Sequence, residues 1–288
     1  MHIRIISPAG HCDCAVIDGG VETLKSWGFE VSIAAHAKGK YGRFAGTAEE
    51  RAQDIIDALE DPAVDVLYAS RGGYGCMQIL DKIPLDLISK ANKPIFGYSD
   101  ITALHALWQK AGVTSVHAHM MKHLGEDADS PTVLLVREIL KEYSKSQNNL
   151  IALCDATEDS CCLSNKALSE AMGVSFDYPI IGGNFAVLSG LHGTEYDFDY
   201  SDKILFLEDI KESPYKIDRM MNQLRLAGVF YKIKGLILGQ FTGCDEDPEM
   251  PKSLYETIRE MVEPYAVPIY FDAPIGHIDN NVPVVEGV

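Results

Sequence analysis

The 288-residue sequence lacks any apolar run that approaches the roughly 18 residues a membrane-spanning helix needs. Its first residues, MHIRIISPAG, also lack the long apolar core of a secretory signal peptide and are typical of a first strand. We therefore expect a cytoplasmic protein that has no membrane partner.

Basic residues are scarce, because 25 Lys and Arg stand against 42 Asp and Glu and give a formal net charge of −17. Nucleic-acid binding needs a stripe of positive charge along the phosphate backbone, and the sequence shows none. Acidic charge spread in this way mainly favours solubility. A small molecule or a peptide is therefore the expected substrate, and no nucleic-acid partner is expected.

Paired cysteines are also missing. The seven cysteines are odd in number and have no disulfide-like spacing, which indicates reduced thiols. Neither the pair Cys12 and Cys14 nor the doublet Cys161 and Cys162 has a convincing fourth metal ligand. We therefore expect no structural metal at these cysteines and no cofactor.

What the sequence does contain is an alternation of strands and helices over its first 120 residues. One helix has a clear start, because Thr47-Ala-Glu-Glu50 is a capping box, and a clear stop at Asp61-Pro62. The expected strands of this half are HIRIIS, EVSIAAH, VDVLYAS, KPIFGYS and TSVHAH. Strands joined by helical crossovers predict a doubly wound, mainly parallel sheet of the α/β class.

The alternation breaks between residues 126 and 170, where a helix starts at EDADSP and polar, cysteine-containing segments follow. A second α/β unit begins at YPIIGGN and continues through the strands KILFLED, GLILGQF and PIYFDA. We predict an N-terminal α/β domain over 1–125, a connecting segment over 126–170 and a smaller C-terminal α/β domain over 171–288.

Four polar clusters follow expected strands of both units: RGGYG, GYSD, LED with Glu208, and APIGH with His277. Ligands of open α/β sheets bind at the carboxyl ends of the strands. The sequence therefore predicts an active site in the cleft between the two domains.

Ser99 supplies the hydroxyl at the joint between KPIFGYS and the helix that follows. Gly97 allows a sharp turn there, which would lift the hydroxyl above the sheet and leave the next amides free as oxyanion donors. The G-x-S-x-G pattern is incomplete, because Ile101 replaces its second glycine. From position alone, a plain helix N-cap is the simpler interpretation.

The other clusters also have two interpretations each. The amides of RGGYG can converge on an anion, although the stretch matches no nucleotide-binding motif and is equally explained as a tight turn. Taken singly, Glu208 is typical of a charged strand end and His277 of a surface loop. Together with Ser99 they supply a nucleophile, a base and an orienting acid.

A competing constellation is HAHMMKH, which contains His117, His119 and His123. An H-x-H pair can bind zinc from a strand end. However, Met121 and Lys122 stand where hydrolytic zinc sites of the HxHxDH type carry an acid. Alternation along a strand explains the pattern without metal.

Several blocks of the sequence, in order, resemble the LD-carboxypeptidase family, the serine peptidases of the S66 type. The blocks are SPAG, RAQDIIDALEDPAVDVLYASRGGYG, FGYSDITALH, PIIGGNFAVLSGLHGT, ILFLEDIKESPYKIDRMMNQLRLAG and GLILGQF, and they cover most of the chain outside about 126–175. The sequence departs from the family at His117-Ala118-His119, where relatives often show His-Gly-Pro.

The resemblance implies two α/β domains with a Ser-His-Glu triad in the cleft. Ser99 of GYSD becomes the nucleophile, Glu208 of FLED the orienting acid and His277 of APIGH the base. The implied oxyanion donors are the amides of Asp100 and Gly73.

The resemblance also implies a substrate. The family cleaves the bond before the terminal D-alanine of murein tetrapeptides in cell-wall recycling, and it suggests a homodimer. Arg71 and Gly72 are the candidates for contact with the peptide or muropeptide. A sister branch, the microcin C immunity peptidases, acts on acyl-sulfamoyl adenylates and stacks the adenine on a loop aromatic, whereas Trp27 and Trp108 lie in helical patterns here. A zinc hydrolase and a non-catalytic binding protein remain as less favoured alternatives.

Overall fold

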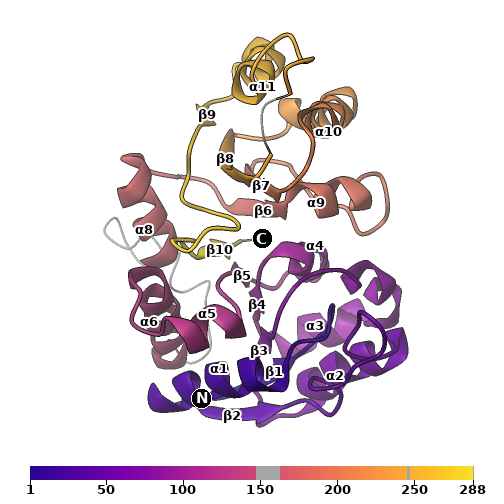
Figure 1. Cartoon of the computed structure of the whole chain (residues 1–288), viewed down its shortest axis with the longest axis vertical. Helices are drawn as coiled ribbons and strands as arrows, with labels where there is room; N and C mark the ends of the chain where they lie inside the picture. The colour runs from indigo at the N-terminus through magenta and orange to yellow at the C-terminus, as the bar shows by residue number, and fades with distance from the viewer. Residues whose placement is uncertain (147–162, 245–246, 288) are drawn as a thin grey trace.

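A computed structural model of the chain describes residues 1–146, 163–244 and 247–287. It contains two sheets, one above the other in Figure 1, with helices packed around each. The first sheet has the strand order β10-β5-β4-β3-β1-β2, and the second has the order β6-β7-β8-β9. The predicted α/β class with mainly parallel sheets is confirmed.

The first sheet is built from β1 (His2–Ile6), β2 (Glu30–Ile33), β3 (Val66–Ala69), β4 (Ile95–Gly97), β5 (Ser115–His117) and β10 (Val284–Glu286). Its first five strands are parallel. The helices of this half are α1 (Cys14–Ser26), α2 (Ala48–Glu60), α3 (Leu85–Ala91), α4 (Thr102–Lys110), α5 (Met121–Glu126) and α6 (Pro131–Lys145).

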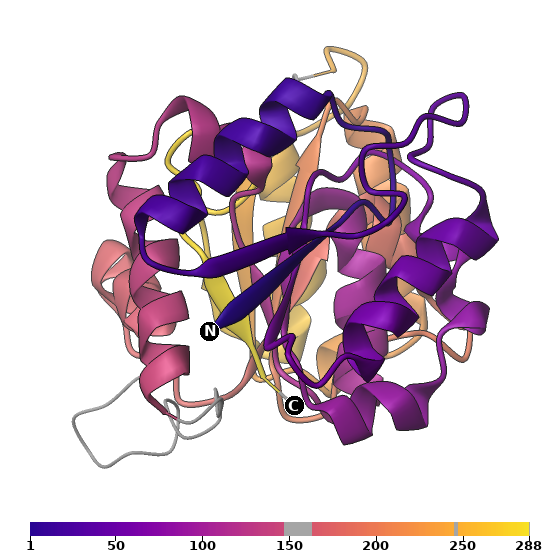
Figure 2. The same ribbon diagram turned by 90° about the horizontal axis from the view of Figure 1, so that it is seen from below.

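Helices cover both faces of the first sheet, as Figure 2 shows from below, and residues of the strands divide between the two helix layers. Ile5 and Val66 pack with residues of α1, α5 and α6, whereas Ile6 and Leu67 pack with residues of α2, α3 and α4. The strands are therefore apolar on both faces, as expected of a parallel sheet that helices cover on both sides.

The second sheet is parallel throughout and consists of β6 (Ile180–Asn184), β7 (Ile204–Ile210), β8 (Gly235–Thr242) and β9 (Ile269–Tyr270). Its helices are α8 (Leu163–Met172), α9 (Phe185–Leu191), α10 (Pro214–Leu226) and α11 (Leu254–Val262). One apolar core continues from Leu104 of α4 to Phe185 of α9 and Leu205 of β7, so the two sheets share a packed boundary.

Local signals in the sequence explain several helix starts. The predicted capping box at Thr47 is present, because its side chain accepts from the Glu50 amide while the Glu50 carboxylate accepts from the Thr47 amide. Ser253 and Glu256 make the same arrangement at α11. The helix expected after EDADSP begins at Pro131 behind a Ser130 cap and ends at Lys145.

The strand β10 was not predicted from the sequence. It pairs antiparallel with β5, so the last described part of the chain returns to the first sheet after forming the second (Figure 1). Its Glu286 also accepts a hydrogen bond from the Gly182 amide of β6 at 3.2 Å. This strand therefore contacts both sheets.

The strand order places a switch point between β1 and β3, because the chain builds outward in opposite directions from these neighbours. The loops after β1 and β3 leave the sheet on the same edge, as does the loop after β4 that carries Ser99. No helix in the described part of the chain is long and apolar enough to cross a membrane.

Candidate active site

Ser99 lies two residues after the end of β4, at the start of a 3-10 turn (Ser99–Ile101) that leads into α4. Its backbone φ is +66°, a left-handed conformation that non-glycine residues rarely adopt. Backbone strain of this kind is found at sharp turns that hold a functional side chain. The hydroxyl lies 3.1 Å from His277 Nε2, so the observed contact is with an imidazole and not that of a helix cap.

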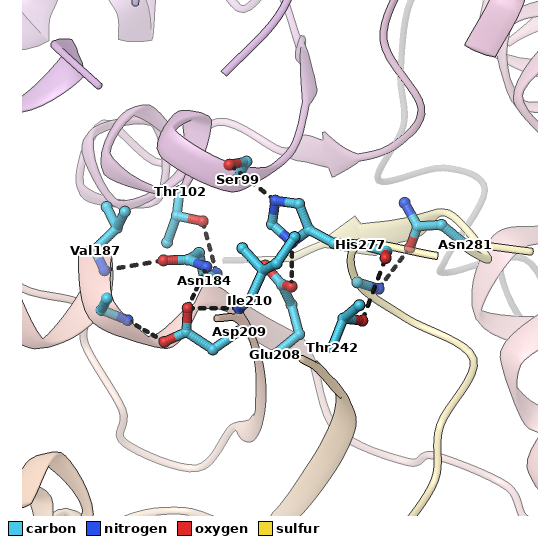
Figure 3. A network of polar contacts seen from close by, with 12 residues as sticks. Ser99, Thr102, Asn184, Val187, Glu208, Asp209, Ile210, Thr242, His277 and Asn281 are labelled. Atoms are coloured by element: carbon cyan, nitrogen blue, oxygen red, sulfur yellow. Dashed lines mark hydrogen bonds and ion pairs between the residues drawn. The ribbon is translucent and has the colours of Figure 1, made fainter. Parts of the chain in front are cut away.

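His277 lies between the elements of the two sheets (Figure 3). Its Nε2 faces Ser99, after β4 of the first sheet, and its Nδ1 lies 2.7 Å from Glu208 Oε2, toward the end of β7 in the second sheet. Because a carboxylate only accepts hydrogen bonds, Nδ1 carries the proton toward Glu208 and Nε2 is left to accept from the Ser99 hydroxyl. The structure thus brings together the three side chains that the sequence singled out.

The loop that carries His277 is held by polar contacts of its own. Asn281 Oδ1 accepts from the Gly276 amide at 2.8 Å, and Thr242 Oγ donates to the His277 carbonyl at 3.2 Å (Figure 3). A Cβ on Gly276 would lie 2.9 Å from Glu208 Oε2, so only glycine lets the loop pass this close to the buried carboxylate. These contacts fix the imidazole between its two partners.

The glycine turn after β3 lies against Ser99, the predicted nucleophile. A Cβ on Gly72 would lie 2.8 Å from Ser99 Cβ and 3.1 Å from the Asp100 nitrogen. Gly73 has a φ of +113°, which glycine adopts without steric cost. The turn and the first amides after Ser99 therefore meet at the place where an oxyanion hole is expected.

A cavity of about 600 Å³ opens beside these residues. Ser99, His277 and Ile210 of β7 are among the residues that line it. Its lining includes the cations of Arg71 and Lys122 and the single carboxylate of Asp13. Arg71, predicted to contact substrate, donates to the His11 carbonyl at 3.1 Å and leaves further guanidinium donors available.

The sequence did not reveal a second polar network next to Glu208. The side-chain nitrogen Nδ2 of Asn184 donates to Asp209 Oδ1 at 2.9 Å, and the backbone N–H of Asn184 donates to Thr102 Oγ of α4 at 2.9 Å (Figure 3). Burial, assisted by the neighbouring Glu208 charge, raises the pKa of Asp209 to about 6. The network links the helix after Ser99 to the strand end that carries Glu208.

Tyr98 was also overlooked, although it precedes the nucleophile. Its ring centroid lies 5.0 Å from that of His277, and it lines the same cavity. Burial raises the pKa of Tyr98 to about 12, so its hydroxyl is neutral across the physiological range. The sequence signal that could have identified Tyr98 is its place in FGYSD, beside Ser99, and for Asn184 it is the place in PIIGGN.

The structure does not unite His117, His119 and His123 as one set of metal ligands. Within the described ranges, the cluster of donors close enough for a metal is His105, His117 and Glu286, with donor atoms within 4.8 Å of one another. Burial lowers the pKa of His105 to about 4 and raises that of Glu286, which favours their neutral forms.

The geometry of that cluster fits a metal poorly. His105 Nε2 lies 3.7 Å from Glu286 but only 3.0 Å from the Gly97 carbonyl, to which it donates. The described cysteines Cys12, Cys14, Cys76 and Cys244 are free thiols, and the doublet Cys161 and Cys162 lies outside the described residues.

A hydroxyl, an imidazole and a buried carboxylate in one hydrogen-bonded row, beside a cavity, form the arrangement that serine hydrolases of several unrelated folds share. Comparison of the sequence with models of known protein families identifies the family within this class. Residues 3–118 match the model of the LD-carboxypeptidase N-terminal domain, and residues 179–288 match that of the C-terminal domain. The chain belongs to the LD-carboxypeptidase family, peptidase family S66.

Relatives agree with this assignment along nearly the whole chain. A probable murein peptide carboxypeptidase of Bacillus subtilis is 30% identical over 288 residues, which cover 99% of this chain and 86% of the relative. The crystal structure of a muramoyltetrapeptide carboxypeptidase from Oxalobacter formigenes superposes with a TM-score of 0.78 at 27% identity, covering 100% of this chain and 93% of that one. The microcin C7 self-immunity protein of Escherichia coli is 26% identical over 87% of this chain and 77% of its own length.

Proposed function

We propose that this protein is a serine carboxypeptidase that releases the terminal D-alanine of murein tetrapeptides. The observation that carries the proposal is the row Ser99–His277–Glu208, which spans the two domains beside the cavity. The relatives named as murein peptide carboxypeptidases supply the substrate class.

In the proposed mechanism Ser99 Oγ attacks the carbonyl carbon before the D-alanine and passes its proton to His277 Nε2. Glu208 stabilises the imidazolium that forms and keeps its Nδ1 proton oriented. The amides of Asp100 and Gly73 donate to the carbonyl oxygen as it becomes negative. His277 then protonates the leaving amine, and a water activated by the same imidazole hydrolyses the ester on Ser99.

A carboxypeptidase must also recognise the free carboxylate of the terminal residue. The cavity offers the cations Arg71 and Lys122 against one carboxylate, Asp13, in a chain whose net charge is −17. This local reversal of sign suits an anionic peptide end. We assign that contact to Arg71, with Gly72 beside it on the substrate side of the turn, and we place the reaction in cytoplasmic cell-wall recycling by a homodimer.

The second candidate is cleavage of an acyl-sulfamoyl adenylate, because the chain is also similar to the microcin C7 self-immunity protein. The tryptophans give it no support, since Trp108 is fully buried in α4 and Trp27 ends α1. Neither lines the cavity at Ser99, where the aromatic side chain is Tyr98.

One substrate panel separates the two candidates. The enzyme is incubated with a murein tetrapeptide, with the same peptide amidated at its D-alanine, and with an aminoacyl sulfamoyl adenosine, and products are identified by mass spectrometry. We expect free D-alanine and tripeptide from the first, and loss of most of kcat/KM on amidation. Equal cleavage of free and amidated peptides would exclude a carboxypeptidase, and cleavage of the adenylate alone would select the second candidate.

A further inference from the structure

Arg51 of α2 is a buried cation that lies behind the glycine turn and outside the cavity lining. Only 1% of its surface is exposed, and its guanidinium donates to three backbone carbonyls and one side chain. A buried charge is costly unless its donors are satisfied. Because all three guanidinium nitrogens of Arg51 have hydrogen-bond partners, we infer that this side chain has a specific structural role.

Arg51 joins the loop after β1 to the glycine turn after β3, at the switch point of the first sheet. The single nitrogen Nη1 donates to the Pro8 carbonyl in the loop after β1, at 2.5 Å, and to the Gly75 carbonyl in the turn after β3, at 2.9 Å. A second link between the same loops is the hydrogen bond from the Gly10 amide to the Gly72 carbonyl at 3.3 Å. Arg51 thus holds the far end of the turn, and Gly10 holds its near end.

The loop that carries Ser99 also contacts the glycine turn, on the side opposite Arg51. Asp100 Oδ2 accepts from the Cys76 amide at 2.9 Å, directly after the turn. The Asp100 carboxylate and the guanidinium of Arg51 attract each other across this joint. The turn is therefore held between a buried cation on α2 and the residue that follows Ser99.

The turn needs such support because its backbone is unusual. Gly73 and Gly75 have φ values of +113° and +135°. A Cβ on Gly75 would lie 2.8 Å from Arg51 Nη1, which shows how closely the guanidinium approaches the chain. Glycines are conformationally free in the absence of such contacts, so the direction of their amides depends on what packs behind them.

We propose that Arg51 is a positioning residue of the oxyanion hole, which fixes the glycine turn so that its amide faces the substrate carbonyl beside Ser99. The inference rests on the proposed serine mechanism. An oxyanion hole binds the transition state in preference to the ground state. Removal of Arg51 should therefore lower kcat and leave KM nearly unchanged.

Lys93 provides a matched control for the loss of a buried cation. It is 8% exposed, and its ammonium donates to the carbonyls of Ala58, Leu59 and Asp61 at 3.0, 2.9 and 2.6 Å, at the C-terminal end of α2. Arg51→Met and Lys93→Met thus each remove a donor from three carbonyls. In each set one carbonyl keeps a second donor, because the Gln78 amide still donates to Gly75 and the Val64 amide to Asp61. A purely structural role predicts the same kind of loss from both.

The variants Arg51→Met, Arg51→Lys and Lys93→Met are compared by thermal unfolding and by steady-state kinetics with the tetrapeptide. We expect kcat to fall about 100-fold for Arg51→Met, as for loss of an oxyanion donor, and less for Arg51→Lys, with KM within about threefold. Lys93→Met should lose stability but keep kcat. Equal kcat changes at both positions, or a folded Arg51 variant of unchanged kcat, would overturn the inference; if Arg51→Met does not fold, Arg51→Lys decides.

A second readout separates this inference from the proposed substrate. Acylation of Ser99 by an activated ester, followed by intact-mass spectrometry, needs the oxyanion hole but no murein peptide. We expect the acylation rate to fall in the Arg51 variants and to persist in Lys93→Met. If the wild type acylates but releases no D-alanine, the proposed substrate fails while the role of Arg51 stands; undiminished acylation in the Arg51 variants would contradict that role.

Discussion

Glu208 has no exposed surface, and its Oε2 is paired with His277 Nδ1 at 2.7 Å. In the proposed mechanism this carboxylate stabilises the imidazolium that forms when Ser99 loses its proton, and it holds the imidazole in the tautomer that accepts from Ser99. The neighbouring Asp209 does not contact His277 in this way, because its oxygens accept from Asn184 and from the backbone amides of Ala186 and Ile210.

Glu208→Gln should therefore affect the reaction more than binding. The amide keeps the shape but removes the charge, so we expect kcat to fall by about 10³- to 10⁴-fold, as when the acid of a triad is neutralised, with little change in KM. Steady-state kinetics check this, and Glu212→Gln serves as the control, because Glu212 lies in the loop after β7, is partly exposed and pairs with Lys216 at 3.0 Å. A raised KM with unchanged kcat would show that Glu208 only binds substrate.

The histidine after β5 gives a prediction about stability. His119 is fully buried, and its Nε2 lies 3.0 Å from Thr132 Oγ. Burial lowers the pKa of His119 to about 3. In the unfolded chain His119 takes up a proton near pH 6.5, whereas in the folded protein it stays neutral until a much lower pH. The contribution of His119 to stability is therefore fully present above pH 6.5 and is lost as the pH falls below that value.

His119→Gln removes this titration. Between pH 7.5 and pH 5.0 the wild type should lose about 2 kcal/mol of unfolding free energy relative to the variant, since each unit below 6.5 is worth about 1.4 kcal/mol. Urea unfolding of both proteins at the two pH values measures the difference, in which the groups common to both proteins cancel. A pH-independent difference would mean that His119 takes up a proton in the folded protein as readily as in the unfolded chain.

At the scale of single elements, the glycine turn and the turn at Ser99 work as one unit. The sequence predicted both turns, because glycines and a serine follow apolar strands. Their contact could not be predicted, since it depends on the close approach of Gly72 to Ser99. The strand β10 was missed because its three residues, Val284–Glu286, are too short to show a period. The capping box at Thr47, which depends only on neighbours in the chain, was predicted correctly.

Gly72→Ala tests that contact. The added methyl carbon would stand 2.8 Å from Ser99 Cβ, so either the turn or the nucleophile must shift. We expect kcat to fall at least about tenfold, with a smaller effect on thermal stability, because a displacement of an ångström in a catalytic group is costly. Gly19→Ala in α1 is the matched control, since its nearest contact would be an ordinary 3.6 Å. Equal activity of the two variants would argue against close contact at the turn.

At the scale of the whole molecule, the sequence predicted two α/β units with polar clusters at their strand ends, and the sheets and the cavity agree. It could not by itself place His277 beside Ser99, because 178 residues separate them and their meeting depends on how the two sheets pack. Thr102 of α4 with Asn184 of β6, and Glu286 of β10 with Gly182 of β6, are contacts that join the elements of the first sheet to the second sheet. They keep the two halves of the site in register.

The most direct test of the account is the rate of D-alanine release from a murein tetrapeptide by the wild type and by Ser99→Ala. Thermal unfolding and substrate binding should be preserved in the variant, because the hydroxyl is lost without disturbing the packing around it. We predict that the wild type yields free D-alanine and tripeptide, and that Ser99→Ala lowers kcat by about 10⁴- to 10⁶-fold. A folded Ser99→Ala variant that kept even a tenth of the wild-type rate would contradict the serine mechanism.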